Sequence, residues 1–189
     1  MGHDDRAYKG GFPDSPGAGM NLLFRLIAVI AAAMAGRPVG FLEPARLRFR
    51  VWPTDLDLNM HMTNARYFSV MDLGRVDLML RSGMGRSILR HRWQPVIGAA
   101  NVRFRRPLAP FRQFELATRV LCWDDKYFFI EHRVETAGGT AALAVVQGAF
   151  VVRGAVVPPA QILAVHGEYR ESPPMPDFVA AWRERPLAN

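Results

Sequence analysis

The sequence predicts an α+β domain in which one long helix lies beside an antiparallel sheet of about five strands. Three observations lead to this class. A strand-like segment comes first, apolar side chains then recur at helical spacing over residues 65–82, and four more strand-like runs follow. Tight turns join several of these runs, so neighbouring strands are expected to be antiparallel. The chain has 189 residues, of which 50% are hydrophobic, enough for one core.

The strands are predicted from alternation and from turn residues. In the first strand, Leu47, Phe49 and Val51 alternate with basic residues and are expected to face inward. Residues 124–126 and 138–139 are typical of hairpin turns between later strands. The five predicted strands cover residues 46–52, 95–105, 115–123, 127–135 and 141–152.

The predicted helix carries two acid–base pairs, Asp72 with Arg75 and Asp77 with Arg81, at the spacing of ordinary surface ion pairs. Gly74 lies in mid-helix, where glycine costs up to about 1 kcal/mol against alanine. This cost is understandable if another element packs closely against the helix there.

Composition divides the chain into four parts. They are a disordered tail over residues 1–19, an apolar helix over 20–38, a folded domain over 44–158, and a C-terminal extension over 159–189 that decorates the surface and holds a short helix near 178–183. The uninterrupted apolar run is about half of the ~20 residues that a membrane-spanning helix needs. We expect residues 20–35 to pack on the domain or lie on a membrane surface; an export signal and a plain structural helix are the alternatives.

The chain is basic, with 24 Lys and Arg against 17 Asp and Glu and a formal net charge of +7. This balance is compatible with an anionic ligand, an anionic membrane surface or nucleic acid. A single cysteine, Cys122, excludes an internal disulfide framework and a multi-cysteine zinc site, and it is expected to be buried packing. A reducing, cytoplasmic location is the simplest fit. Of the adjacent residues Glu131 and His132 in a predicted strand, one is expected to face solvent.

A polar segment before the helix carries most of the functional information. Asp55, Asp57, Asn59 and His61 alternate with apolar residues, and an extended backbone would place all four side chains on one side. The adjoining helix N-terminus offers unpaired N–H groups and partial positive charge. Two carboxylates, an amide and an imidazole at such a place are typical of attack on an acyl carbonyl. The alternative is that these residues serve only as caps and turn formers.

The stretch D-L-D-L-N-M-H-M-T-N-A-R-Y, from Asp55 to Tyr67, resembles the signature of hotdog-fold thioesterases. It is most similar to the acyl-ACP thioesterase pattern D-x-D-x-N-x-H-x-x-N-x-x-Y. The passage F-R-R-P-L at residues 104–108 also resembles the superfamily, and residues 47–152 follow its order of strand, central helix and four strands. In length, the single-domain 4-hydroxybenzoyl-CoA thioesterase-like branch matches best.

The resemblance implies a role for each matching residue. Asp57 takes the place of the catalytic carboxylate, as nucleophile or general base, and Asn59 and His61 match the amide and imidazole positions. The backbone N–H of Asn64 or Ala65 falls where the thioester carbonyl is polarised. Two departures matter: the second hotdog repeat of the acyl-ACP enzymes is not found here, and the single-domain CoA enzymes often lack this Asn and His. Asp55 is expected to form a turn.

The resemblance also implies an acyl-CoA or acyl-ACP substrate of fatty acid metabolism, no cofactor or metal beyond that thioester, and a homodimer or dimer of dimers. Arg103, Arg105 and Arg106 suit the phosphates of coenzyme A. The alternative, which is the more common case for such residues, is a solvated face of the sheet. Nucleic acid is not expected as a partner. Two rival functions remain open: an enoyl-CoA hydratase-type enzyme and a non-catalytic acyl-binding or membrane-associated protein.

Overall fold

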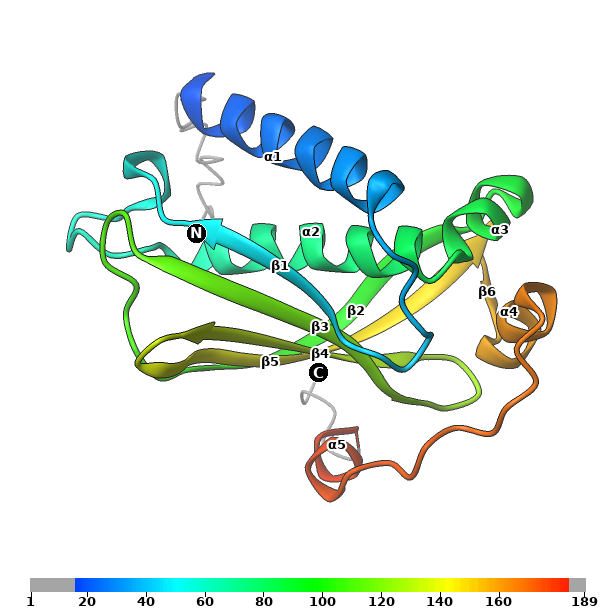
Figure 1. Cartoon of the computed structure of the whole chain (residues 1–189). Coiled ribbons are helices and arrows are strands. Elements are labelled where there is room, and N and C mark those ends of the chain that lie inside the picture. The colour runs from blue at the N-terminus through cyan, green and yellow to red at the C-terminus, as the bar shows by residue number, and fades with distance from the viewer. Residues whose placement is uncertain (1–15, 184–189) are drawn as a thin grey trace, which may run out of the picture.

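A curled antiparallel sheet wraps around helix α2 (Asn64–Arg81), as Figure 1 shows. The computed structural model describes residues 16–183, with side chains from residue 22 onward. The strands pair in the order β1-β3-β4-β5-β2, and β6 pairs with β5. They are β1 (Ala45–Arg50), β2 (Gln94–Phe104), β3 (Gln113–Trp123), β4 (Phe128–Thr136), β5 (Gly139–Val152) and β6 (Ala155–Val157). The predicted α+β class is confirmed, with one strand more than expected.

Helix α2 starts and stops where its sequence dictates. The Thr63 side chain caps it by accepting the N–H of Arg66 at 3.2 Å. Gly83 ends it in the left-handed conformation, with φ at +82°. At Gly74 strand β3 comes so close that an added Cβ would lie 2.6 Å from Leu116. The close packing that this glycine predicted is therefore present.

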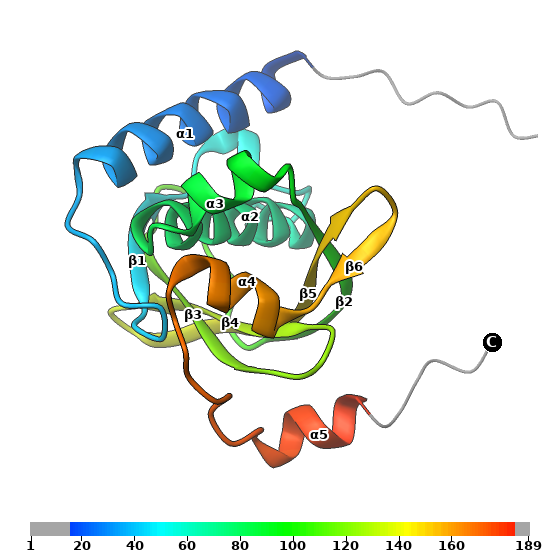
Figure 2. The ribbon, with the colours of Figure 1, turned by 90° about the vertical axis from the view of Figure 1, so that its right-hand side faces the viewer.

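Two further helices cover the outside of this core (Figure 2). Helix α1 (Pro16–Ala35) lies over α2 on the side away from the sheet, where it buries Val29 and Ala33. Helix α5 (Asp177–Arg183) lies on the opposite face of the sheet and buries Val179 completely. The C-terminal extension is thus packed structure and not mere decoration. None of the helices within residues 16–183 has the length and apolarity that crossing a bilayer requires.

Several element boundaries differ from the predictions. Helix α1 begins at Pro16, before the predicted start at residue 20, and the rest of the predicted tail lies outside the described residues. Helices α3 (Met84–His91) and α4 (Pro159–His166) were not predicted, and neither was β6. Each is short, and the glycines and prolines around it are typical of turns. The core extends into α4, where Ile162 and Leu163 are buried.

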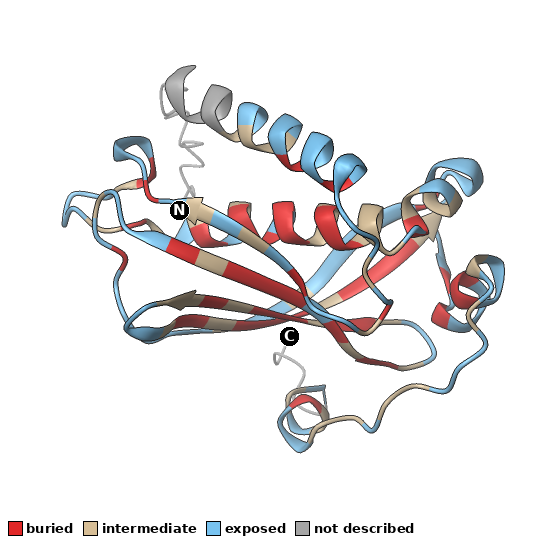
Figure 3. Ribbon diagram, in the orientation of Figure 1, coloured by how far each residue is buried: buried red, intermediate tan, exposed pale blue. Residues whose placement is uncertain are grey.

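Strand β2 forms one edge of the sheet, and nine of its eleven residues are exposed. Figure 3 shows the strand mostly in the pale blue of exposed residues. The exposed side chains include Val96 at 41%, Ile97 at 43% and Phe104 at 41%. A long, apolar edge strand with unpaired backbone groups is prone to pair with another strand. The opposite edge, β1, is shorter and alternates exposed arginines with half-buried Leu47 and Phe49, as predicted.

Candidate active site

The polar segment before α2 folds as a tight turn. The N–H of Asp57 donates to the carbonyl of His61 at 2.8 Å. The Asp57 side chain closes the turn, because its Oδ1 accepts the N–H of Asn59 at 2.9 Å and that of His61 at 3.2 Å. The predicted extended backbone, with four polar side chains on one side, is therefore wrong. Asp57 and Asn59 are exposed and His61 is half-buried, whereas Asp55 is buried.

Asp55 anchors the segment from the inside. Its side chain is 1% exposed, with Oδ2 at 2.6 Å from Arg25 of α1 and Oδ1 at 3.0 Å from Arg66 of α2. Oδ2 also accepts the N–H of Trp52 at 2.9 Å, which fixes the short 3-10 helix η1 (Pro53–Asp55). The predicted turn role of Asp55 accounts for η1. The two ion pairs were not predicted, and they join α1, the polar segment and α2.

The N-terminus of α2 adjoins the turn. Within residues 16–183, the N–H groups of Asn64 and Ala65 have no hydrogen-bond partner, as expected for the first turn of a helix. Both residues are exposed. These N–H groups and the helix dipole favour negative charge at this end, which is what an oxyanion needs. Asn64 thus lies at the helix end where the sequence placed it.

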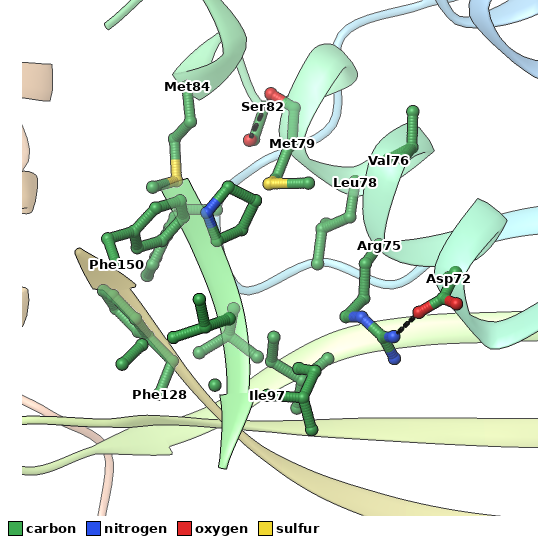
Figure 4. A pocket seen from close by; sticks show the side chains of 17 residues that line it. Asp72, Arg75, Val76, Leu78, Met79, Ser82, Met84, Ile97, Phe128 and Phe150 are labelled. Atoms are coloured by element: carbon green, nitrogen blue, oxygen red, sulfur yellow. Dashed lines mark hydrogen bonds and ion pairs between the residues drawn. The ribbon is translucent and has the colours of Figure 1, made fainter. Parts of the chain in front are cut away.

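A pocket of about 190 Å³ lies between the C-terminal half of α2 and strands β2 and β5 (Figure 4). Residues 95–97 of the edge strand and Phe150 belong to its wall. Apart from Asp72, Arg75 and Ser82, all of its lining residues are apolar or glycine. The Ser82 hydroxyl donates to a helix carbonyl, so the Asp72–Arg75 pair is the main polar feature. No pattern in the sequence predicts this pocket directly.

The buried side chain of His132 holds Arg75 at the pocket. Nη1 of Arg75 lies 3.0 Å from Nε2 of His132, whose Nδ1 lies 3.0 Å from Oγ1 of Thr118. Because a guanidinium only donates, we assign Nε2 as acceptor and place the proton of a neutral ring on Nδ1. Burial, together with the neighbouring Arg75, holds the pKa of His132 well below its usual range. Burial lowers the pKa of Arg75 to about 10, so this side chain remains charged at neutral pH.

The two ion pairs of α2 are not the surface pairs that their spacing predicted. Arg75 pairs with Asp72 but is only 14% exposed, since it reaches toward the sheet. Asp77, which lies 3.4 Å from Arg81, is 1% exposed. Burial raises the pKa of Asp77, although Arg81 opposes the shift. Helical spacing shows that two charges meet, but not whether a sheet covers them.

The expectation for strand β4 also needs correction. Glu131 and His132 are both buried, at 6% and 0% exposure, although they point to opposite faces. Glu131 is covered on the outer face and accepts from Arg119 at 2.9 Å. Cys122 is fully buried, as predicted, and burial, with a smaller contribution from Asp124, raises its pKa to about 11.

Arg103, Arg105 and Arg106 are all exposed at the C-terminal end of β2. The N–H groups of Arg105 and Arg106 donate to the Ala141 carbonyl at 2.8 and 3.1 Å, so the backbone there is fixed while the side chains remain free to reach outward. The polar turn lies at this same end of β2, because the N–H of Met62 donates to the carbonyl of Leu108 at 2.9 Å.

The turn and the pocket therefore lie at opposite ends of the same two elements. The ring of Tyr67, in the first turn of α2, contacts Phe104 at the end of β2 with centroids 5.1 Å apart. The pocket lies beside the last turns of α2 and residues 95–97, at the start of β2. Within one chain, the carboxylate and the pocket are separated by the length of the edge strand.

Comparison with known proteins places this geometry in a family. Residues 51–183 match the thioesterase-like superfamily. The protein THEM6 of Xenopus laevis is 40% identical over 83 residues, which are 44% of this chain and 40% of that protein. A probable thioesterase of Saccharomyces cerevisiae is 27% identical over 123 residues, which are 63% of this chain and 53% of that protein. The chain spans about half the length of the curated relatives it matches.

Solved structures agree on the fold. A gentisyl-coenzyme A thioesterase superposes with a TM-score of 0.58 at 20% identity, covering 64% of this chain and 99% of that one. The curled sheet around α2 is the hotdog arrangement of these structures, as the resemblance implied. The match over residues 51–183 contains the polar turn, α2 and all strands except β1. On these grounds, this chain belongs to the thioesterase-like superfamily.

Proposed function

We propose that this protein hydrolyses acyl-coenzyme A thioesters, with Asp57 as base or nucleophile and the N-terminus of α2 as the oxyanion site. The observation that carries the proposal is the turn before α2. It fixes the Asp57 carboxylate on two backbone N–H groups, and it comes shortly before the end of α2 at which the N–H groups of Asn64 and Ala65 are unpaired. Family membership supports thioester hydrolysis in general.

The chain's own residues supply the chemistry in one of two ways. As general base, Asp57 takes a proton from water, the water oxygen attacks the carbonyl carbon, and the C–S bond breaks to release a thiol and a carboxylic acid. As nucleophile, Asp57 forms an anhydride with the acyl group and expels the thiolate, and water then cleaves the anhydride. In both, the N–H groups of Asn64 and Ala65 stabilise the oxyanion.

His61 and Asn59 support this reaction. His61 orients the substrate or the water, or replaces Asp57 as the base; its backbone N–H donates to the Asp57 carboxylate, and the residue is half-buried in the same turn. Asn59 holds a water or fixes the carboxylate, to which its own N–H donates.

In this proposal a second copy of the chain completes the site. Pairing β2 with β2 of the second copy in antiparallel fashion covers the open edge and forms a two-fold dimer. The end of β2 near Phe104 then lies beside residues 95–97 of the other copy. Since the polar turn lies at the first of these ends and the pocket at the second, Asp57 of one copy faces the pocket of the other.

Coenzyme A is the proposed carrier because of the arginines at that same end. Arg103, Arg105 and Arg106 are exposed beside the turn, and guanidinium groups bind phosphate well. Arg105→Gln with Arg106→Gln is expected to raise KM for acyl-CoA by about tenfold with kcat unchanged. Arg48→Gln is the matched control, because Arg48 is 90% exposed on β1, the edge strand opposite to β2.

The test is a hydrolysis assay over short, long and aromatic acyl-CoAs and acyl-ACPs, with enoyl-CoA hydration measured beside it. Hydrolysis of at least one acyl-CoA that Asp57→Asn abolishes supports the proposal. Tight acyl-CoA binding without turnover would favour a non-catalytic acyl-binding protein. Hydration without hydrolysis would favour the hydratase-type enzyme.

We also propose that α1 touches an anionic membrane surface. One side of α1 packs on α2, and its other side exposes Leu23, Phe24, Ile27 and Met34 at 55%, 65%, 55% and 79%. An apolar stripe on a basic protein suits a surface of anionic lipid. Cosedimentation with phosphatidylserine vesicles should fall for Phe24→Ser with Ile27→Ser and stay unchanged for Leu89→Ser, at an even more exposed leucine on α3. Equal cosedimentation of all three proteins would contradict this contact.

A further inference from the structure

The apolar pocket contains one cation, and that cation has hydrogen-bonding capacity to spare. A guanidinium has five N–H groups. Within the described residues, Arg75 donates one N–H to His132 and one to Asp72. The others have no partner among the described residues, and the Arg75 side chain lies in the wall of the pocket on the side of Ile97 (Figure 4).

The surroundings of Arg75 fix its position and its charge. His132 of strand β4 is fully buried and accepts the hydrogen bond from Arg75 at Nε2, while Thr118 holds the far side of the imidazole ring. Asp72 is 65% exposed and pairs with Arg75 from the solvent side. The guanidinium is therefore held between two partners, so little conformational freedom is lost when a third acceptor binds.

An all-carbon acyl chain would leave these N–H groups without an acceptor once it displaced water from the pocket. Unpaired buried donors are costly, and the cost is larger for charged groups. A ligand oxygen at Arg75 removes this cost. The pocket volume of about 190 Å³ suits a group of about the size of one benzene ring or a short chain.

We propose that Arg75 is a specificity-determining residue that selects short acyl groups with a hydrogen-bond acceptor oxygen, a hydroxyl or a carboxylate, at the end remote from the thioester. This inference rests on the proposed function, because it assigns the pocket to the acyl group. The Asp72 carboxylate offsets the charge of Arg75, so both kinds of oxygen fit, and an experiment with separate arms distinguishes them.

The experiment measures kcat and KM of the full chain for matched acyl-CoAs. One series is hexanoyl-, 6-hydroxyhexanoyl- and adipoyl-CoA, and a second series is longer by one carbon. We expect the better oxygenated substrate to exceed its plain partner at least tenfold in kcat/KM, mostly through KM. A higher rate for the hydroxy compound identifies an alcohol site, and one for adipoyl-CoA an acid site.

Variants assign the preference to Arg75. Arg75→Met should abolish the preference, and Arg75→Gln, which keeps a donor for His132, should weaken it while supporting the fold. Arg81→Met is the matched control, because Arg81 also pairs with an aspartate of α2 but lies outside the pocket. Since the preference is a ratio within one protein sample, partial unfolding of a variant does not change it.

Two results would overturn the inference: a wild-type protein that prefers the plain chains, or an Arg75→Met protein that keeps the oxygen preference. Calorimetric binding of the same acyl-CoAs separates this inference from the proposed hydrolysis. If no thioester is hydrolysed but the oxygenated ones bind at least tenfold more tightly in an Arg75-dependent way, the hydrolase proposal fails and the assignment of Arg75 stands.

Discussion

The two ends of helix α2 hold polar groups in opposite surroundings. At the N-terminal end, Asp57 is exposed in a turn that is held by its own backbone and by the Asp57 carboxylate. At the C-terminal half, Arg75 is 14% exposed and is braced by His132 from the sheet. A carboxylate that works on water must be reached by water, whereas a cation that selects an acyl group is more effective where water is excluded. In the proposed function, the first is the reacting end of α2 and the second is the selecting end.

The largest expected effect is at the reacting end. Asp57→Asn keeps an oxygen for the turn but removes the charge that takes a proton or attacks the carbonyl. We expect kcat for the best acyl-CoA to fall by about 10²- to 10⁴-fold, with KM little changed. Steady-state kinetics with a thiol-detecting reagent measures both constants.

Asp124→Asn is the matched control for that variant. Asp124 also sits in a tight turn, where its Oδ1 accepts the N–H groups of Lys126 and Tyr127, both at 2.8 Å. It lies in the β3–β4 hairpin and should leave kcat unchanged. Equal losses in the two variants would mean that Asp57 only shapes its turn.

Asp55 sharpens the contrast within the polar segment, because it is two residues from Asp57 and buried between Arg25 and Arg66. Asp55→Asn leaves two cations without their carboxylate, and we expect the free energy of unfolding to fall by about 3 kcal/mol. Denaturant titration measures this change. Glu115→Gln, in a pair that is 51% exposed on its arginine side, should cost less than about 1 kcal/mol.

The selecting end should make stability depend on pH. Burial and Arg75 hold the pKa of folded His132 below the ordinary value of 6.5. Between the pKa of His132 in the folded protein and its ordinary value of 6.5, the unfolded chain binds one more proton than the folded one. The free energy of unfolding therefore falls as pH drops below 6.5, by at most about 1.4 kcal/mol per pH unit. Above 6.5 this contribution is constant.

Urea titrations at about pH 7.5 and about pH 5.5 check the histidine effect. His132→Asn should flatten the dependence, and His91→Asn, at an exposed histidine of α3, should preserve it. If His132→Asn keeps the wild-type slope, the buried imidazole is not the group that responds to pH.

Periodicity alone predicted most of the fold, because α2 and the five long strands are extended enough for apolar repeats to show. The short elements failed for a local reason. Helix α3 starts between Gly83 and Gly85, and α4 starts at two prolines, so both are typical of turns when read without tertiary context.

The polar residues were harder to predict, because distant partners decide their surroundings. Asp55 and Asp57 look alike in sequence, but only Asp55 pairs with Arg25, which is 30 residues away, and only Asp55 is buried. Arg75 and Arg81 each follow an aspartate at helical spacing, by three and four residues. Only Arg75 contacts His132, which is 57 residues away in the sequence and holds that arginine at the pocket. Contacts between residues so far apart in the sequence cannot be predicted from the spacing of neighbouring residues.

The most direct test of a site shared between the reacting end of one copy and the selecting end of another is to mix two inactive variants. Asp57→Asn removes the carboxylate, and Val76→Trp fills the pocket from a half-buried position on α2. In an equal mixture with subunit exchange, half of the dimers combine both chains, and each of these has one intact site. Activity should return to about a quarter of the wild-type value. If the mixture stays as inactive as its components, Asp57 does not serve the pocket of the other copy.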